Sequence, residues 1–147
     1  MHLLLDLTVP TQHSYVRTTR RAIAGYFADA GLPERVSEDL VMAIGEACTN
    51  VVQHAFPNGD GTFRLVLDLQ PDEVVVEVTD TGIGFEPFEQ TLAPRGRLAL
   101  TGRGIEIMRR LVGAVEVESP TPDGGTRVRL RQRLAATSNG RSPTTVR

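Results

Sequence analysis

The sequence predicts an α+β fold, a two-layer sandwich in which three helices cover one face of a mixed, mainly antiparallel sheet of four or five strands. The hydrophobic pattern places the elements in the order β-α-α-β-β-loop-α-β-β. Short turns between consecutive strands favour antiparallel pairing, and strand–helix alternation is too weak for a doubly wound parallel sheet. The chain has 147 residues, of which 40% are hydrophobic, so it suits one globular domain with a sizeable core.

The first half of the chain predicts a strand followed by two helices. Residues 2–8 alternate partly between apolar and polar side chains, which indicates a short strand. Thr11 is the expected N-cap of a helix over residues 12–30, and Gly31 follows where a C-cap glycine belongs. A second helix is expected over residues 33–55. Its apolar residues recur at three- and four-residue spacing, namely Val36, Leu40, Ala43, Ile44, Ala47 and Val51.

The second half predicts two hairpins separated by a long loop and a helix. The expected strands cover residues 62–69, 73–79, 114–119 and 126–134, and the expected helix covers residues 104–112. Residues 81–101 show no periodicity, and a loop of that length in a compact domain is usually functional. Residues 135–147 are rich in Ser, Thr, Arg and Gly without an apolar pattern, so we expect a disordered tail after a domain of residues 1–134.

Charge is distributed unevenly along the chain. Residues 1–90 carry 14 acidic residues against five arginines, whereas residues 91–147 carry four against 11. A basic half suits an anionic partner or a solvated surface, but no aromatic residues interleave with these arginines, so direct nucleic-acid binding is not expected. No apolar run approaches the roughly 20 residues of a membrane span, and the single Cys48 fits a reducing compartment. We therefore expect a cytoplasmic protein without membrane contact.

Two polar residues on the second helix are the first candidates for chemistry. Glu46 and Asn50 are four residues apart, so they project from one side of the helix beside its apolar stripe. A carboxylate and an amide in that place are costly unless they are paired or face a polar pocket. The same two residues also suit the ordinary polar edge of an amphipathic helix.

Three glycine-containing segments supply further candidates. Asp80-Thr-Gly-Ile-Gly84 follows a strand directly, so its glycines allow close approach of a ligand while the acid accepts a hydrogen bond. Thr101-Gly-Arg-Gly104 precedes a helix, where backbone N–H groups and an arginine favour phosphate. Gly124-Gly125-Thr126 opens the last strand. Each segment alone equally suits a plain turn or helix start, and no Walker A sequence is present.

The order of these segments resembles the GHKL ATPase superfamily, which includes histidine kinases, gyrase B, Hsp90 and MutL. Glu46-Ala-Cys-Thr-Asn50 resembles its N box, the segment 80–84 its G1 box and the segment 102–104 a short G2 box. The chain length leaves no room for a phosphoacceptor helix pair. Over residues 1–134 the sequence is similar to bacterial anti-sigma factor serine kinases of partner-switching systems.

The resemblance implies a site for ATP or ADP with Mg²⁺. In it Asn50 supplies an oxygen to Mg²⁺, and Glu46 acts as general base or orients the attacking serine hydroxyl. Asp80 accepts a hydrogen bond from the adenine amino group. Residues 85–101 form a lid. The remaining nucleotide contacts implied by the resemblance are Gly82, Gly84, Thr101, Gly102, Arg103, Gly104 and Thr126.

The same resemblance implies an ATP-dependent protein serine kinase with two partners. It would sequester a sigma factor and phosphorylate a serine on an antagonist of the STAS fold, with Arg17 as a partner contact and a homodimer as the assembly. Arg17 equally suits a solvated surface charge. Leu100 stands where some relatives have an arginine, and Ile105 where many have Leu or Phe. Three alternatives stay open: an ATP-binding protein that sequesters without phosphorylating, a kinase that activates a phosphatase, and a domain without a nucleotide site.

Overall fold

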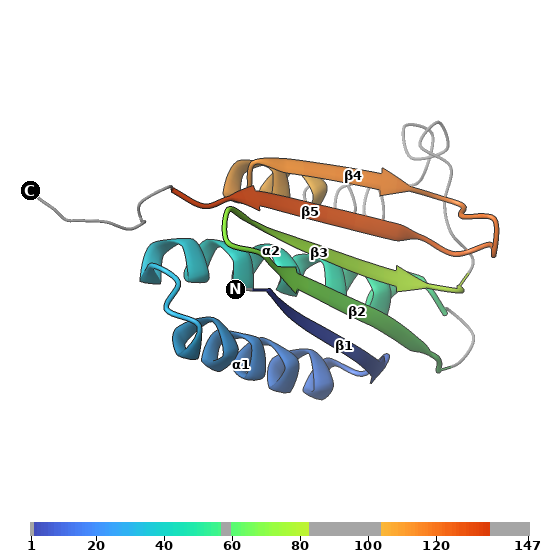
Figure 1. Ribbon diagram of the computed structural model, residues 1–147. Helices are drawn as coiled ribbons and strands as arrows, with labels where there is room; N and C mark the ends of the chain where they lie inside the picture. Colours follow the sequence, from blue (N-terminus) through green and yellow to red (C-terminus); the bar gives the residue numbers. More distant parts are fainter. Residues whose placement is uncertain (1, 57–59, 83–103, 136–147) are drawn as a thin grey trace, which may run out of the picture.

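The computed structural model describes residues 2–56, 60–82 and 104–135. In chain order, the described residues contain β1 (Leu3–Pro10), α1 (His13–Asp29), α2 (Glu34–His54), β2 (Thr62–Leu69), β3 (Glu73–Asp80), β4 (Ala114–Glu118) and β5 (Arg127–Arg133). Residues 104–111 are also helical. The strands form one antiparallel sheet in the order β1-β2-β3-β5-β4 (Figure 1). The predicted α+β fold is confirmed.

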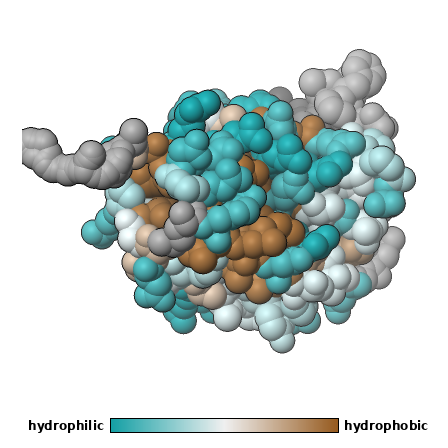
Figure 2. All heavy atoms as spheres, in the orientation of Figure 1, coloured by the Kyte–Doolittle hydropathy of each residue, from teal (hydrophilic) through white to brown (hydrophobic). Residues whose placement is uncertain are grey.

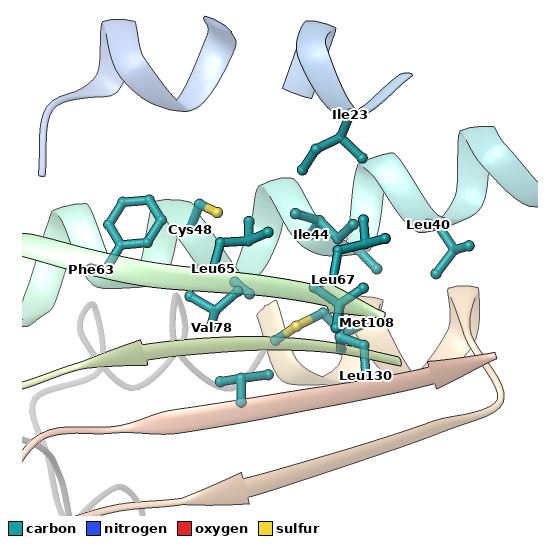
Figure 3. Close-up of a cluster of buried hydrophobic side chains, with 14 of the residues drawn as sticks. Ile23, Leu40, Ile44, Cys48, Phe63, Leu65, Leu67, Val78, Met108 and Leu130 are labelled. Atoms are coloured by element: carbon teal, nitrogen blue, oxygen red, sulfur yellow. The ribbon is translucent and has the colours of Figure 1, made fainter. Parts of the chain in front are cut away.

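The core lies between the sheet and the helices. Alternate residues of β2 and β3 are buried, because successive side chains of a strand point to opposite faces. They pack against the apolar faces of α1 and α2, whose buried residues recur at helical spacing. Figure 3 shows Ile23 of α1, Ile44 of α2 and Met108 of the helix at 104–111 turned toward Leu67 and Leu130, and all five side chains are fully buried.

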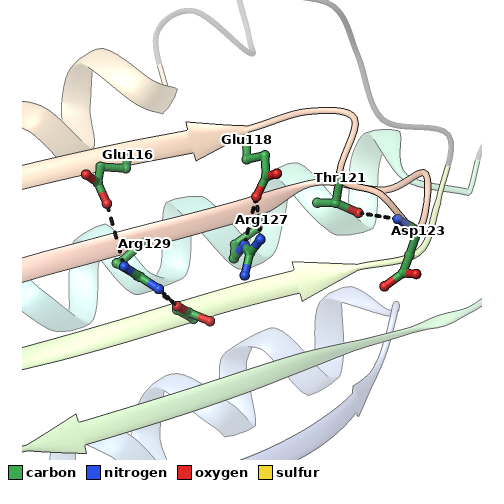
Figure 4. Close-up of polar contacts among 7 residues, drawn as sticks. Glu116, Glu118, Thr121, Asp123, Arg127 and Arg129 are labelled. Carbon is green, nitrogen blue, oxygen red and sulfur yellow. Dashed lines mark hydrogen bonds and ion pairs between the residues drawn. The ribbon is translucent and has the colours of Figure 1, made fainter.

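The opposite face of the sheet carries charged side chains. Arginines of β5 pair with glutamates of the strands on either side: Arg127 with Glu118, Arg129 with Glu77 and Glu116, and Arg131 with Glu73. We call this set the charge ladder. Figure 4 shows the pairs of Arg127 with Glu118 and of Arg129 with Glu116. Figure 2 shows hydrophilic residues gathered over β4 and β5 on this face, with a hydrophobic patch below them. The outward position Leu4 on β1 is 64% exposed.

The ends of α1 agree with the sequence prediction at one end only. At the C-terminal end Gly31 has φ +82°, its N–H donates to the carbonyl of Ala28, and the Leu32 N–H donates to the carbonyl of Phe27. This is the Schellman arrangement that favours glycine, so the predicted C-cap is confirmed. The predicted N-cap is wrong. Gln12 occupies that position without a side-chain bond.

Thr11 does not cap α1 because its hydroxyl is used elsewhere. Its Oγ1 donates to the carbonyl of Gly61 at 3.0 Å and accepts from the Gly61 N–H at 2.9 Å. The Thr11 backbone N–H also donates to the Gly61 carbonyl. These bonds extend the β1–β2 pairing by one residue beyond the partners Pro10 and Thr62.

Parts of two predicted segments lie outside the described residues. Of the loop at residues 81–101 the structure describes 81 and 82, and of the tail at 135–147 it describes residue 135. Among the described helices, none is long and apolar enough to span a membrane.

Candidate functional site

Asn50 lies against the beginning of the helix at 104–111. Glu46 and Asn50 are both half-buried, at the edge of the buried face of α2. A Cβ placed on Gly104 would lie 2.9 Å from Asn50 Nδ2 and 3.2 Å from Oδ1, so the backbone of Gly104 approaches the carboxamide closely. The structure therefore brings two sequence-predicted residues together that belong to different segments, with Glu46 one turn before Asn50 on the same side of α2.

Asp80 is the last residue of β3 and is only 4% exposed. Its Oδ1 accepts a hydrogen bond from the Gly82 N–H at 2.8 Å, and its carboxylate also accepts from the Thr126 N–H. The Asp80 N–H in turn donates to the Thr126 carbonyl at 2.9 Å. Burial raises the pKa of Asp80 above its usual 3.8, whereas the two amide donors act in the opposite direction.

Two glycines let backbone segments approach at distances that no side chain permits. A Cβ on Gly82 would lie 2.1 Å from the carbonyl oxygen of Ala55, the residue after α2. A Cβ on Gly125 would lie 1.9 Å from the carbonyl oxygen of Asp80. The end of α2, the end of β3 and the start of β5 therefore meet at one end of the molecule (Figure 1).

Several predicted residues are not part of this described arrangement. Gly84, Thr101, Gly102 and Arg103 lie outside the described residues. Arg17 is exposed on α1. Ala55 and Ser119 were not among the predicted site residues, although the Ser119 hydroxyl lies 2.7 Å from that of Thr126. No pattern in a single sequence marks a backbone carbonyl as a contact, but the paired strands that flank 119 and 126 could have indicated Ser119.

The arrangement has the chemistry of a nucleotide site. A buried carboxylate held by two backbone amides retains lone pairs for an N–H group of a ligand base. Gly104 is the first described residue of the helix at 104–111, and backbone N–H groups at the N-terminal end of a helix suit phosphate. Gly104 lies next to the Asn50 carboxamide, whose oxygen is a hard ligand suited to Mg²⁺. The glycines at 82, 104 and 125 let Ala55, Asn50 and Asp80 approach the backbone more closely than a Cβ would allow, which brings these segments of the site together. The residues present therefore fit a nucleotide with its magnesium ion.

A comparison with known families identifies the family of this chain. Residues 9–132 match the histidine kinase-like ATPase domain. The chain belongs to this family. Within the histidine kinase-like ATPase family it is similar to the serine-protein kinase RsbW of Bacillus mycoides, with 35% identity over 77% of this chain and 76% of the relative. It is also 30% identical to an anti-sigma F factor of Clostridium beijerinckii, over 81% of this chain and 86% of the relative. The predicted resemblance to anti-sigma factor serine kinases is thus confirmed.

Solved structures share the fold of this chain. The RsbU and RsbW domains of Rv1364c from Mycobacterium tuberculosis match with a TM-score of 0.67 and 21% identity, covering 90% of this chain and 32% of that one. This chain therefore corresponds to about a third of that protein. A chain of the SiaB–SiaC complex from Pseudomonas aeruginosa is a second match, with a TM-score of 0.56 and 17% identity, covering 88% of this chain and 89% of that one. At these identities the likeness concerns the fold alone.

Proposed function

We propose that the protein is a cytoplasmic anti-sigma factor and ATP-dependent protein serine kinase. It sequesters a sigma factor and phosphorylates a serine on an antagonist of the STAS fold. The observation that carries this proposal is the contact between the Asn50 carboxamide and the backbone of Gly104, which joins an oxygen ligand to a helix start. The names of the relatives, serine-protein kinase and anti-sigma F factor, support the kinase and the sigma-factor partner.

In the proposed site ATP is the substrate and lies with its base at Asp80 and its phosphates at the start of the helix at 104–111. Asp80 accepts from the exocyclic amine of adenine, while Thr126 and Gly82 line the base. Gly84, Thr101, Gly102 and Arg103 complete the nucleotide contacts in this proposal. Mg²⁺ held by Asn50 would neutralise phosphate charge during transfer.

Glu46 is the residue that we assign to the serine substrate. It lies one turn of α2 before Asn50 and is half-buried, so its carboxylate can reach a hydroxyl placed beside the phosphates. There it accepts the hydroxyl proton, or orients the hydroxyl, as the serine oxygen bonds to the terminal phosphorus of ATP, the bond from that phosphorus to the bridging oxygen breaks and ADP leaves. Phosphoryl transfer depends mainly on positioning and charge neutralisation, and these few groups supply both.

We assign Arg17 a contact with a partner protein. We also propose that the protein assembles as a homodimer. Arg17 is exposed on α1 and therefore accessible to another protein. A phosphorylated antagonist would dissociate and leave the protein free to hold its sigma factor. The same ATP site would also serve a kinase that activates a phosphatase, so partner capture is part of the test.

The first experiment measures thermal unfolding of the full chain with and without Mg²⁺-ADP or Mg²⁺-ATP. Nucleotide at 100 times its Kd adds about 2.7 kcal/mol to the free energy of unfolding, which raises the midpoint by roughly 5–10 °C. We expect the shift to need Mg²⁺ and to vanish in Asn50→Ala. No shift at millimolar nucleotide would overturn the nucleotide site.

The second experiment follows transfer of the terminal phosphate of ATP to STAS-domain proteins of the same organism. We expect a phosphoserine product, lost in Glu46→Gln and Asn50→Asp. Nucleotide binding without transfer would instead support a protein that sequesters its partner and holds ATP as a structural ligand. Capture with the full chain then distinguishes a sigma factor from a phosphatase, and Arg17→Ala is expected to weaken that capture while nucleotide binding is unchanged.

A further inference from the structure

A pair of hydroxyl groups lies beside the buried carboxylate. Ser119 directly follows β4 and Thr126 directly precedes β5, so they face each other one step beyond the paired residues Glu118 and Arg127. Their hydroxyl oxygens are 2.7 Å apart, a hydrogen bond in which either oxygen can be the donor. Both residues are half-buried.

The backbone of Thr126 is fixed from both sides by Asp80. Its N–H donates to the Asp80 carboxylate and its carbonyl accepts from the Asp80 N–H. The main chain of Thr126 is therefore held in place. The side-chain rotamer and the rotation of the hydroxyl remain adjustable, and Ser119 is the hydrogen-bond partner of that hydroxyl.

The turn between the two residues is itself held in shape. The Thr121 N–H donates to the Gly125 carbonyl and the Gly124 N–H to the Thr121 carbonyl, each at 2.8 Å. The Asp123 N–H donates to Thr121 Oγ1 (Figure 4). Thr121 is buried. Ser119 thus contacts Thr126 from the end of a turn whose backbone is held by hydrogen bonds.

We propose that Ser119 is a positioning residue that sets the purine preference of the site by fixing the hydroxyl of Thr126 as a donor. The proposal rests on the nucleotide site proposed above. When Ser119 donates to Thr126, the Thr126 proton is left for the ligand. An ionised carboxylate only accepts, so the pair then offers an acceptor beside a donor.

That pattern complements a 6-amino purine and opposes a 6-oxo purine. The former presents an exocyclic N–H donor next to a ring-nitrogen acceptor, which the Thr126 hydroxyl can meet directly or through a water. The latter presents a carbonyl acceptor next to a ring N–H, so both positions would be mismatched. Without Ser119 the Thr126 hydroxyl rotates freely and serves either pattern, so discrimination falls.

The test compares ADP and GDP binding to the full chain, with Ser119→Ala as the main variant. We expect Ser119→Ala to lower the ratio of ADP to GDP affinity about fivefold, the equivalent of one ordinary hydrogen bond, and Ser119→Thr to retain it. Thr126→Val removes the hydroxyl at similar volume. When Thr126→Val is already present, adding Ser119→Ala is expected to have no further effect on the ratio of ADP to GDP affinity, because Ser119 acts through Thr126.

Two controls separate this role from a structural one. The unfolding midpoint of each nucleotide-free variant reports stability, and Ser119→Cys provides a second variant of similar size should Ser119→Ala unfold. An unchanged affinity ratio in a folded variant that still binds ADP overturns the inference alone. An effect that persists in Thr126→Val also overturns it. Absence of ADP binding by the unmodified chain overturns the proposed function and this inference with it.

Discussion

At the scale of single residues, Asp80 is the place where the sheet departs from its own pattern. The inward positions of β3 are Val74, Val76 and Val78, and the fourth is Asp80, which is as buried as the valines. An aliphatic residue there would extend the core. A carboxylate instead bears a desolvation cost, which the amides of Gly82 and Thr126 offset only in part. Such a cost is typical of a group kept for a ligand.

This cost predicts how Asp80→Asn changes stability with pH. Because the folded-state pKa of Asp80 is raised above 3.8, ionisation destabilises the folded protein. The penalty is absent below pH 3.8, grows as the pH rises from there to the folded-state pKa, and is constant above it. The difference in unfolding midpoint is therefore expected to move in favour of Asp80→Asn as the pH rises above 3.8, as measured by thermal unfolding without nucleotide.

The same variant is expected to weaken ADP binding at least tenfold at pH 7, since a hydrogen bond to a charged group is worth about 1.5–3 kcal/mol. Asp72→Asn, at an exposed turn residue, is the matched control and should bind ADP normally. If the difference in stability between Asp80→Asn and the unmodified chain did not change with pH, the effect of burial on the pKa of Asp80 would be contradicted. If Asp80→Asn bound ADP normally, Asp80 would not belong to the proposed site.

At the scale of elements, α1 contains Gly25 and is followed by Gly31, and the backbone conformations of these two glycines differ. Gly31 has φ +82°, where a side chain is strained, whereas Gly25 lies within the helix with nothing within 4 Å of a built Cβ. We expect Gly31→Ala to lower the free energy of unfolding by about 1–2 kcal/mol. Gly25→Ala should raise it by up to about 1 kcal/mol, because alanine loses less entropy in a helix. Urea denaturation measures both, and equal effects would contradict the C-cap assignment.

Elements were more predictable than the contacts between them. Strand alternation and helical spacing depend on neighbours in sequence, so the order of elements and the position of Gly31 followed from the sequence. Thr11 failed as an N-cap because its partner Gly61 is 50 residues away, where local rules do not reach. Likewise the spacing placed Glu46 and Asn50 on one side of a helix, but the approach of Asn50 to Gly104 requires the whole sheet to bring α2 and the later helix together.

At the scale of the whole molecule, the charge ladder explains the uneven charge of the sequence. The arginines of β5 belong to the basic half of the chain, and two of their partners, Glu73 and Glu77 on β3, belong to the acidic half. Antiparallel pairing of β3 with β5 places these opposite charges on one face. A basic segment in the sequence is therefore neutralised in the fold, and the free energy of folding must come mainly from the other face of the sheet.

Substitutions at neighbouring residues of β5 can test how much the buried face and the charged face of the sheet each contribute to stability, because neighbouring side chains of a strand point to opposite faces. Leu130 is fully buried, so Leu130→Ala is expected to lower the free energy of unfolding by about 2–5 kcal/mol. Arg129 pairs with Glu77 and Glu116 at a side chain 39% exposed, and Arg129→Ala should cost at most about 1 kcal/mol, less at high salt. Urea denaturation at low and high salt compares the two. A cost for Arg129→Ala that equals that of Leu130→Ala and persists in salt would mean that the charged face, rather than the core, holds β5 in the sheet.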